Sequence, residues 1–295
     1  MGALDTDYEV NGKRSKERLD HARKPLDAFF KHYRAASITT TAIRKYQRER
    51  LADVSPATVN REIAYLRRAL RLAHHENRLA RLPHVPMLSE PKARDVTLEN
   101  DGELVSLVNA LPEHHKRWVA LAACTGWRRN AILSRTWADI ITDSDGTRWL
   151  TLDRKSSKNA EAYRFPVVGD VKRILDEQRA YVEKLERETE TVTRWIFPYP
   201  DGRQIRNPEF WFRRAAKAAG CPDLHIHDLR RFAVSRMVEM GVAEADVMAL
   251  AGMETRSILD RYNVTNERRK VAAVERLTGA LDAKPSKQVV GFTAK

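Results

Sequence analysis

The sequence predicts a mainly α-helical protein with a small antiparallel β-sheet, divided into two domains. Apolar residues recur at helical spacing along most of the 295 residues. The spacing changes to strand-like alternation only between residues 137 and 168. A polar stretch with several prolines interrupts the helical pattern near residue 90. We therefore expect a helical domain over residues 1–88, a linker over 89–97 and a second domain, with a C-terminal helix and tail, over 98–295.

Two helices are expected at the start of the first domain. One covers residues 14–32, is highly charged, and should be interrupted or kinked at Pro25. The other begins where Thr39 or Thr40 can accept a backbone hydrogen bond as a capping residue, and it continues through Leu51. Their apolar members are Leu19, Leu26, Phe29, Phe30, Ile43 and Tyr46.

A third helix should begin at Ser55, a capping residue followed by a proline at the first helical position. One of its faces is an apolar stripe made of Val59, Ile63, Leu66, Leu70 and Ala73. The other face carries Arg61, Arg67, Arg68 and Arg71. Arginines on such a face are either solvated or in contact with a phosphate backbone. The helix pattern leaves both interpretations open.

Helices also dominate the second domain. Residues 104–111 have helical spacing that Pro112 ends, and an apolar helix over residues 118–124 ends at the pair Thr125-Gly126. A new helix starts near Arg128. Further helices are expected from residue 170, over 206–219, and from there to about residue 281, before a polar tail over 283–295.

The small sheet should contain about three strands. Residues 137–142, 149–153 and 163–168 alternate or are rich in β-branched and aromatic side chains. The turn sequence DSDG at residues 143–146 joins the first two strands. The last two strands are separated by the polar residues 155–160, which we expect at a hairpin tip.

The composition favours a polyanionic partner and excludes several classes of protein. Lys and Arg number 53 against 40 Asp and Glu, which gives a net charge of +13. Only two cysteines occur, so a disulfide scaffold or a cysteine zinc site is not expected. No apolar run is long enough to span a membrane, and no glycine-rich phosphate loop is present. We expect a reduced, cytoplasmic protein that needs no membrane, metal or cofactor.

Three separated segments carry residues suited to phosphate chemistry. In TGWRR, a glycine turn places Arg128 at a helix start. In HDLRR, one helical turn puts His227 and Arg230 on the same side. The third segment, AGMETRSILDRY, ends at Tyr262. Each segment alone has an ordinary explanation, because lone arginines are usually surface charges and lone histidines or tyrosines usually have structural roles.

Together and in this order, the three segments resemble those of the tyrosine recombinase family, the phage-type integrases. The family's first arginine matches Arg128, and its HxxR box matches His227 and Arg230. Its nucleophile matches Tyr262. The resemblance covers nearly the whole chain. It implies a helical core-binding domain followed by an α+β catalytic domain.

The resemblance also assigns a lysine and the chemistry. The family's hairpin lysine lies a fixed step before a strand proline, so Pro166 indicates Lys158 rather than Lys155. The tyrosine would attack a DNA phosphodiester and form a covalent phosphotyrosine, without metal or ATP. His227 is the candidate base for the phenol proton, and Lys158 is the candidate acid for the leaving 5′ oxygen.

Two residues depart from the family's pattern. Ala131 stands where an acidic residue usually follows the first arginine by one helical turn and supports the architecture of the active site. Met253 stands where a histidine or tryptophan usually donates a hydrogen bond to the phosphate, and a thioether has no donor. A water or a neighbouring side chain such as His225 would have to fill that place.

The resemblance implies double-stranded DNA as the partner, with a dimer on each site and a tetramer at the synapse. It also implies a bacterial protein, or one encoded by a phage or another mobile element, that is associated with the nucleoid. The two domains would clamp the duplex, and the segment after the tyrosine would finish the core or dock on a neighbouring protomer. The expected groove and backbone contacts are Thr58, Asn60, Arg61, Arg67, Arg68, Lys92 and Arg94.

Three other functions stay open beside a site-specific recombinase. A DNA-binding member with attenuated catalysis is favoured by Met253 and Ala131. A type IB topoisomerase would use the same chemistry, but the separate helical domain favours the integrase type. A metal-dependent nuclease is the weakest option, because His225 and His227 have no acidic cluster beside them.

Overall fold

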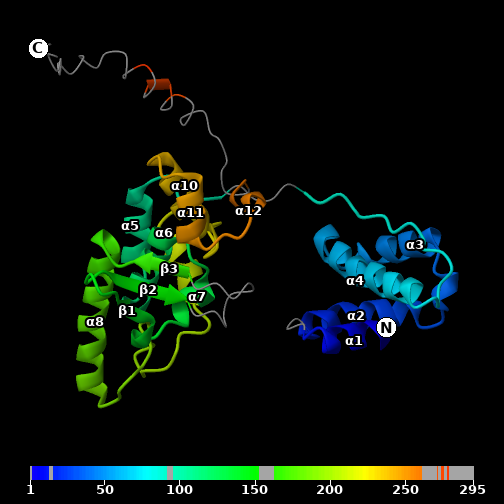
Figure 1. The fold of residues 1–295 in the computed structure, drawn as a ribbon, viewed down its shortest axis with the longest axis horizontal. Coiled ribbons are helices and arrows are strands. Elements are labelled where there is room, and N and C mark those ends of the chain that lie inside the picture. The colour runs from blue at the N-terminus through cyan, green and yellow to red at the C-terminus, as the bar shows by residue number, and fades with distance from the viewer. Residues whose placement is uncertain are drawn as a thin grey trace, which may run out of the picture. The chain divides into compact units, whose positions relative to one another are not determined.

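The computed structural model describes residues 2–12, 16–91, 96–152 and 163–260, together with 271, 274, 275 and 278 in a C-terminal helical stretch. Contacts divide the chain into two units, residues 1–94 and 95–295 (Figure 1). Within the described residues, the secondary structure is helical apart from one three-stranded antiparallel sheet and isolated bridges. The predicted fold class is therefore confirmed.

The first unit is helical throughout its described elements (Figure 1). These are α1 (Gly2–Val10), α2 (Lys16–Phe30), the short 3-10 helix η1 (Ala35–Ser37), α3 (Thr40–Arg50) and α4 (Pro56–His75). Pro25 lies inside α2 and does not end it. The apolar spacing does not indicate α1. Among the side chains of α1 that the structure describes, Leu4 and Tyr8 are buried, against Leu19 of α2 and the adjoining face of α4.

Caps and an apolar stripe fix α3 and α4. Thr39 is the capping residue of α3 and accepts a hydrogen bond from the backbone N–H of Ala42. Ser55 does the same for Thr58 at the start of α4. The predicted stripe of α4 is buried at four positions, Val59, Ile63, Leu66 and Leu70, among Leu26, Phe30, Ile43 and Tyr46. Each such side chain contributes about 1.5–3 kcal/mol through its burial.

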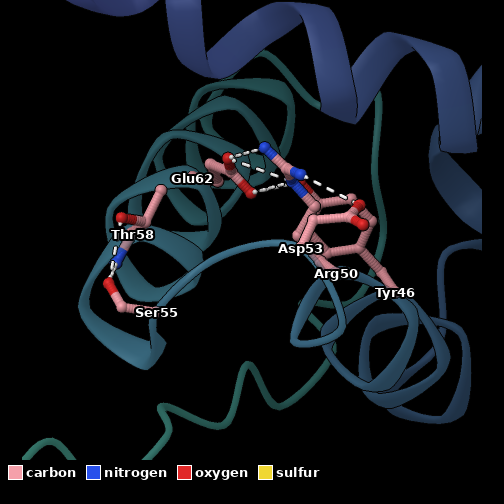
Figure 2. Close-up of polar contacts among 6 residues, drawn as sticks. All are labelled: Tyr46, Arg50, Asp53, Ser55, Thr58 and Glu62. Carbon is pink, nitrogen blue, oxygen red and sulfur yellow. Dashed lines mark hydrogen bonds and ion pairs between the residues drawn. The ribbon is translucent and has the colours of Figure 1, made fainter.

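A buried carboxylate joins α3 to α4 (Figure 2). Glu62 is 4% exposed and accepts a hydrogen bond of 2.6 Å from the hydroxyl of Tyr46. The guanidinium of Arg50 binds the same carboxylate through Nη2 at 3.1 Å and Nε at 3.2 Å. Burial and the adjacent Glu62 raise the pKa of Tyr46, so its phenol stays protonated. Asp53, on the exposed side, forms an ion pair with Arg50.

The chain after α4 returns along the same unit. The side-chain amide of Asn60 donates to the carbonyl of Leu88 at 2.9 Å and accepts from its N–H at 2.8 Å. Gln47 donates to the carbonyl of Pro86, and Thr40 donates to that of His84. These bonds hold the extended segment of residues 84–88 on α3 and α4, directly before the predicted linker.

The second unit is built around helix α6 (Glu113–Thr125). Its buried residues Trp118, Val119, Leu121 and Ala122 form the centre of the largest apolar core. Helix α6 packs most extensively against α5 (Asp101–Asn109), α8 (Gly169–Thr189) and α10 (Asp228–Glu239). The remaining described elements are α7 (Arg129–Leu133), the 3-10 helix η2 (Trp137–Asp139), α9 (Glu209–Ala218), α11 (Glu244–Ala251) and α12 (Arg256–Asp260).

The sheet has the order β1-β2-β3 and is antiparallel throughout (Figure 1). Its strands are β1 (Ile140–Thr142), β2 (Arg148–Leu152) and β3 (Tyr163–Pro166). Leu150 pairs with both Ile140 and Phe165 and is fully buried. The first strand begins later than residue 137, because the carboxylate of Asp139 accepts from the N–H and hydroxyl of Thr136 and closes η2 there.

Candidate active site

A glycine turn presents Arg128 to solvent. Helix α6 ends at Gly126, whose φ of 66° lies in the left-handed region that favours glycine. A Cβ at this position would lie 3.4 Å from that of Ala233 and 3.6 Å from that of Ala251, so the turn is closely packed. Trp127 is buried, and its indole N–H donates to the carbonyl of Leu250 at 2.8 Å. Arg128 follows as the exposed residue before α7.

Arg230 brings the three predicted segments together. Its side chain is only 2% exposed, and its Nη1 donates to the carbonyls of Gly126 at 2.7 Å and Ala251 at 2.6 Å. One acceptor belongs to the segment TGWRR and the other to the segment AGMETRSILDRY. Charge-assisted bonds of this length are strong, and they fix the guanidinium beside the glycine turn.

His227 is the capping residue at the start of α10, in surroundings that lower its pKa. The carbonyl of His225 accepts from the N–H of Asp228, and Oδ2 of Asp228 accepts from the N–H of His225 at 2.8 Å, which closes the turn. The residue is exposed by surface area, yet partial burial of its ring is the largest cause that lowers its pKa. The charge of Arg230 lowers the pKa further. A neutral imidazole can accept a proton near pH 7.

Two pockets meet at the arginines. The smaller, of about 420 Å³, is lined by Arg128, Arg230, both histidines of the HIHDLR sequence and the start of α9. The larger, of about 770 Å³, shares Arg128 and Arg230 and extends to Tyr163 of β3 and to Gly252 and Ile258. The two guanidiniums therefore border both pockets, and Ile258 of α12, a helix within the segment that ends at Tyr262, borders the larger one.

The two residues that depart from the family's pattern lie in different settings. Met253 is 4% exposed and packs in an apolar cluster with Val234, Val247, Ala251 and Leu259. Within the described part of the chain, Met253 is not among the residues that line either pocket. Ala131 lines the larger pocket and packs partly against the core. His225 is exposed and lines the smaller pocket.

Several predicted site residues lie outside the described residues. These are the nucleophile Tyr262, the hairpin lysine Lys158, and the linker residues Lys92 and Arg94. The structure therefore brings together Arg128, His227 and Arg230, and the other assignments stay predictions. Three further residues of the smaller pocket have no role predicted from the sequence: Arg129, which stands in the segment TGWRR, and Glu209 and Arg213, which lie outside the three segments. Glu209 is far from Arg128 in the sequence, but both line the smaller pocket, and Glu209 forms an ion pair with Arg129, the chain neighbour of Arg128.

The predicted DNA contacts of the first unit differ in their surroundings. Arg61 and Arg67 are exposed on α4, and Thr58 is partly exposed. Asn60 is 5% exposed, and its amide binds the backbone of Leu88. Arg68 forms an ion pair of 2.7 Å with Asp7. Of this set, Arg61 and Arg67 are thus the arginines whose side chains are exposed, and their contact with DNA stays a prediction.

The residues that the structure describes hold neither a metal-binding cluster nor a membrane-spanning helix. Within them, no group of three or more His, Cys, Asp or Glu side chains has the geometry to hold a metal ion. In the same residues, every helix is too short or too polar to cross a lipid bilayer.

Residues 97–269 match the model of the phage integrase family, and this match covers more than half of the chain. The chain belongs to the phage integrase family. The integrase of Salmonella phage P22 is 25% identical over 219 residues, which is 70% of this chain and 53% of the relative. The chain thus spans about half the length of this curated relative.

Solved integrase structures have the same fold. A lambda integrase (75–356) dimer bound to a COC′ core site is 19% identical, with a TM-score of 0.69, and covers 90% of this chain and 96% of its own. The Tn1549 transposon integrase in complex with circular intermediate DNA is 15% identical, with a TM-score of 0.68 and coverages of 93% and 98%. At these identities the likeness establishes the fold of tyrosine recombinases.

Proposed function

We propose that the chain is a site-specific DNA recombinase that cuts and rejoins DNA through a covalent 3′-phosphotyrosyl intermediate at Tyr262, without metal or ATP. The supporting observation is the pair of bonds from Arg230 to the carbonyls of Gly126 and Ala251, because it joins all three sequence segments at one place. Arg128 and His227 border the same pocket.

The two arginines bind the scissile phosphate. A phosphodiester carries one negative charge, and more charge accumulates on its non-bridging oxygens as a nucleophile adds. Guanidiniums suit this task, because they stay protonated and donate forked hydrogen bonds. Arg230 is fixed by its two carbonyl partners, whereas Arg128 is exposed and closes on the phosphate from the solvent side.

The covalent step exchanges one phosphate ester for another. The phenol oxygen of Tyr262 bonds to phosphorus, the bond from phosphorus to the 5′ oxygen breaks, and the phenol proton passes to His227. Lys158 donates a proton to the 5′ oxygen. Because the ester bond is conserved, a 5′ hydroxyl from a partner duplex reverses the step and completes strand exchange.

The duplex is held by the two domains together. Residues 1–88 form the DNA-binding unit, residues 89–97 cross the DNA, and residues 98–295 carry the catalytic site. The net charge of +13 and the exposed arginines of α4 favour contact with phosphates. The neighbours include an integrase dimer bound to a core site and an integrase tetramer bound to a Holliday junction. We infer the same assembly here, in the cytoplasm and associated with the nucleoid, for a bacterial or phage-borne protein.

A second function is an attenuated, DNA-binding member of the family. The burial of Met253 in an apolar cluster favours this second function. The family position that usually supplies a hydrogen-bond donor to the phosphate is here an apolar, buried side chain. Retention of Arg128, Lys158, His227, Arg230 and Tyr262 favours the active enzyme.

A trapping experiment separates the two functions. The full chain is incubated with nicked suicide duplexes made from the DNA that flanks its gene, and with a pool of such duplexes of random sequence. We expect a covalent adduct on denaturing gels for the wild type and none for Tyr262→Phe, which keeps the ring and removes the nucleophile. Tight binding of a duplex without any adduct would support the attenuated member.

A further inference from the structure

We propose that Glu209 is a positioning residue for Arg128, which it holds through Arg129, and that it takes the place of the acid missing at position 131. The inference rests on the proposed function, since it assigns Glu209 a part in the same site. It identifies a carboxylate that comes from another helix, α9, far away in the sequence.

The N-terminus of α7 lacks the usual side-chain cap. Arg128 is the capping residue, and among the described residues no side chain makes a capping hydrogen bond there. Ala131 is the third residue of the helix, where an acid in a capping box would bind back to the N–H of the capping residue. With five residues, α7 has little helical stability of its own. Arg128 therefore needs support from elsewhere.

Glu209 provides that support from α9. Its carboxylate forms an ion pair with Nη1 of Arg129, the first residue of α7. Nε of Arg129 donates to Oδ1 of Asn130 at 2.9 Å, which orients the guanidinium toward Glu209. The position of Glu209 is itself fixed, because Phe212 and Ala216 of the same helix, α9, are buried in the core.

The ion pair acts on Arg128 in two ways. Arg129 is its neighbour in the chain, so holding the Arg129 side chain limits the motion of the backbone that carries Arg128. Glu209 also offsets the charge of Arg129, which would otherwise repel the Arg128 guanidinium in the pocket that both line. Both partners are partly exposed, at 32% and 46%, so the pair adds little to the stability of the fold.

The test compares Glu209→Gln with a matched control. Asp176→Asn removes a carboxylate of similar exposure, 44%, which pairs with Lys172 and Arg148 away from the pocket. We expect Glu209→Gln to keep the melting temperature and the affinity for DNA, and to slow single-turnover formation of the tyrosyl adduct about tenfold. In the free protein, amide hydrogen exchange of residues 126–134 should become faster. The control Asp176→Asn should change neither the rate of adduct formation nor the rate of hydrogen exchange at residues 126–134.

Two rescues separate positioning from a general structural role. Exchanging the charges, Arg129→Glu with Glu209→Arg, restores the pair and should recover most of the cleavage rate. Adding Ala131→Glu to Glu209→Gln returns an acid to the start of α7 and should recover the rate as well. Glu209→Gln with wild-type cleavage, or with unchanged exchange at residues 126–134, would overturn the inference. Absence of adduct in the wild type would instead overturn the proposed function, while the exchange measurement still decides whether Glu209 holds α7.

Discussion

Two arginine sites in this chain use their charges in opposite ways. In the first unit, Arg50 and Tyr46 surround the buried carboxylate of Glu62, so positive and negative charges are matched within the protein (Figure 2). Of the described residues that line the smaller pocket of the second unit, four are arginines and one, Glu209, is acidic. The matched site joins two helices, whereas the unmatched site keeps a positive potential for an anion from outside.

The largest effect is expected for Arg230→Lys, which keeps the charge and removes the fork. An ammonium cannot bind both carbonyls and a phosphate oxygen with the same geometry. We expect adduct formation to fall by about 10³-fold and the melting temperature to fall as well, because two inward carbonyls lose their partner. Arg128→Lys is the matched variant, since this exposed side chain should lose cleavage at an unchanged melting temperature. Equal melting temperatures for both variants would contradict the distinction between a buried and an exposed arginine.

Substitutions at the Glu62 site should change the stability of the fold and leave adduct formation unchanged. Glu62→Ala leaves the Arg50 guanidinium and the Tyr46 hydroxyl without their buried acceptor and should lower the free energy of unfolding by about 3 kcal/mol in urea denaturation. Asp53→Ala is the control, because it removes the exposed carboxylate, 71% accessible, from the same arginine. The control should cost less than about 0.5 kcal/mol. A similar loss in both would mean that burial of Glu62 is not what makes its pair strong.

A buried, uncharged histidine, His115, should make the stability of the fold depend on pH. His115 is fully buried, its Nδ1 accepts a hydrogen bond of 2.8 Å from the indole of Trp118, and burial lowers its pKa to about 4. The unfolded chain binds a proton near pH 6.5 and the folded chain only near 4, so stability is present above 6.5 and is lost as the pH falls through 4. The loss amounts to about 3 kcal/mol.

The variant His115→Gln tests this dependence. Its side-chain carbonyl still accepts from Trp118, but it does not titrate, so the free energy of unfolding should decline less between pH 6.5 and 4. An equally steep decline in the variant would assign the pH dependence to other groups, such as the neighbouring His114, whose pKa burial also lowers.

The smallest effect is expected on α4, where an exposed arginine and a paired arginine are neighbours in one helix. Arg67 is exposed on α4, whereas its neighbour Arg68 is paired with Asp7 and lies over the ring of Tyr8. Arg67→Ala should reduce the salt dependence of DNA affinity by about one counterion. Arg68→Ala should leave it nearly unchanged and instead loosen α1. The slope of log affinity against log salt for the two variants is the measurement, and identical slopes would show that the ion pair with Asp7 does not withhold Arg68 from DNA.

Much of the fold could be predicted from local patterns. Helical spacing placed the main helices, Thr39 and Ser55 began α3 and α4 as capping residues, and the turn at residues 143–146 joined the first two strands. These features depend on residues a few positions apart, whose hydrogen bonds close within one turn. The order of the three short segments was also enough to indicate the family, because their residue types are fixed by the chemistry of a phosphodiester.

Only the tertiary structure decided what each charged or polar side chain binds. Arg230 meets the carbonyls of residues 126 and 251, Asn60 binds the returning backbone at Leu88, and Glu209 reaches Arg129 from another helix. Met253, at the position where the family usually has a phosphate donor, lies in an apolar cluster. Such partners are separated by many residues along the chain, and burial of the core brings them together. The sequence by itself therefore determined the elements and the family, and packing determined which charged side chains are paired within the protein and which stay exposed.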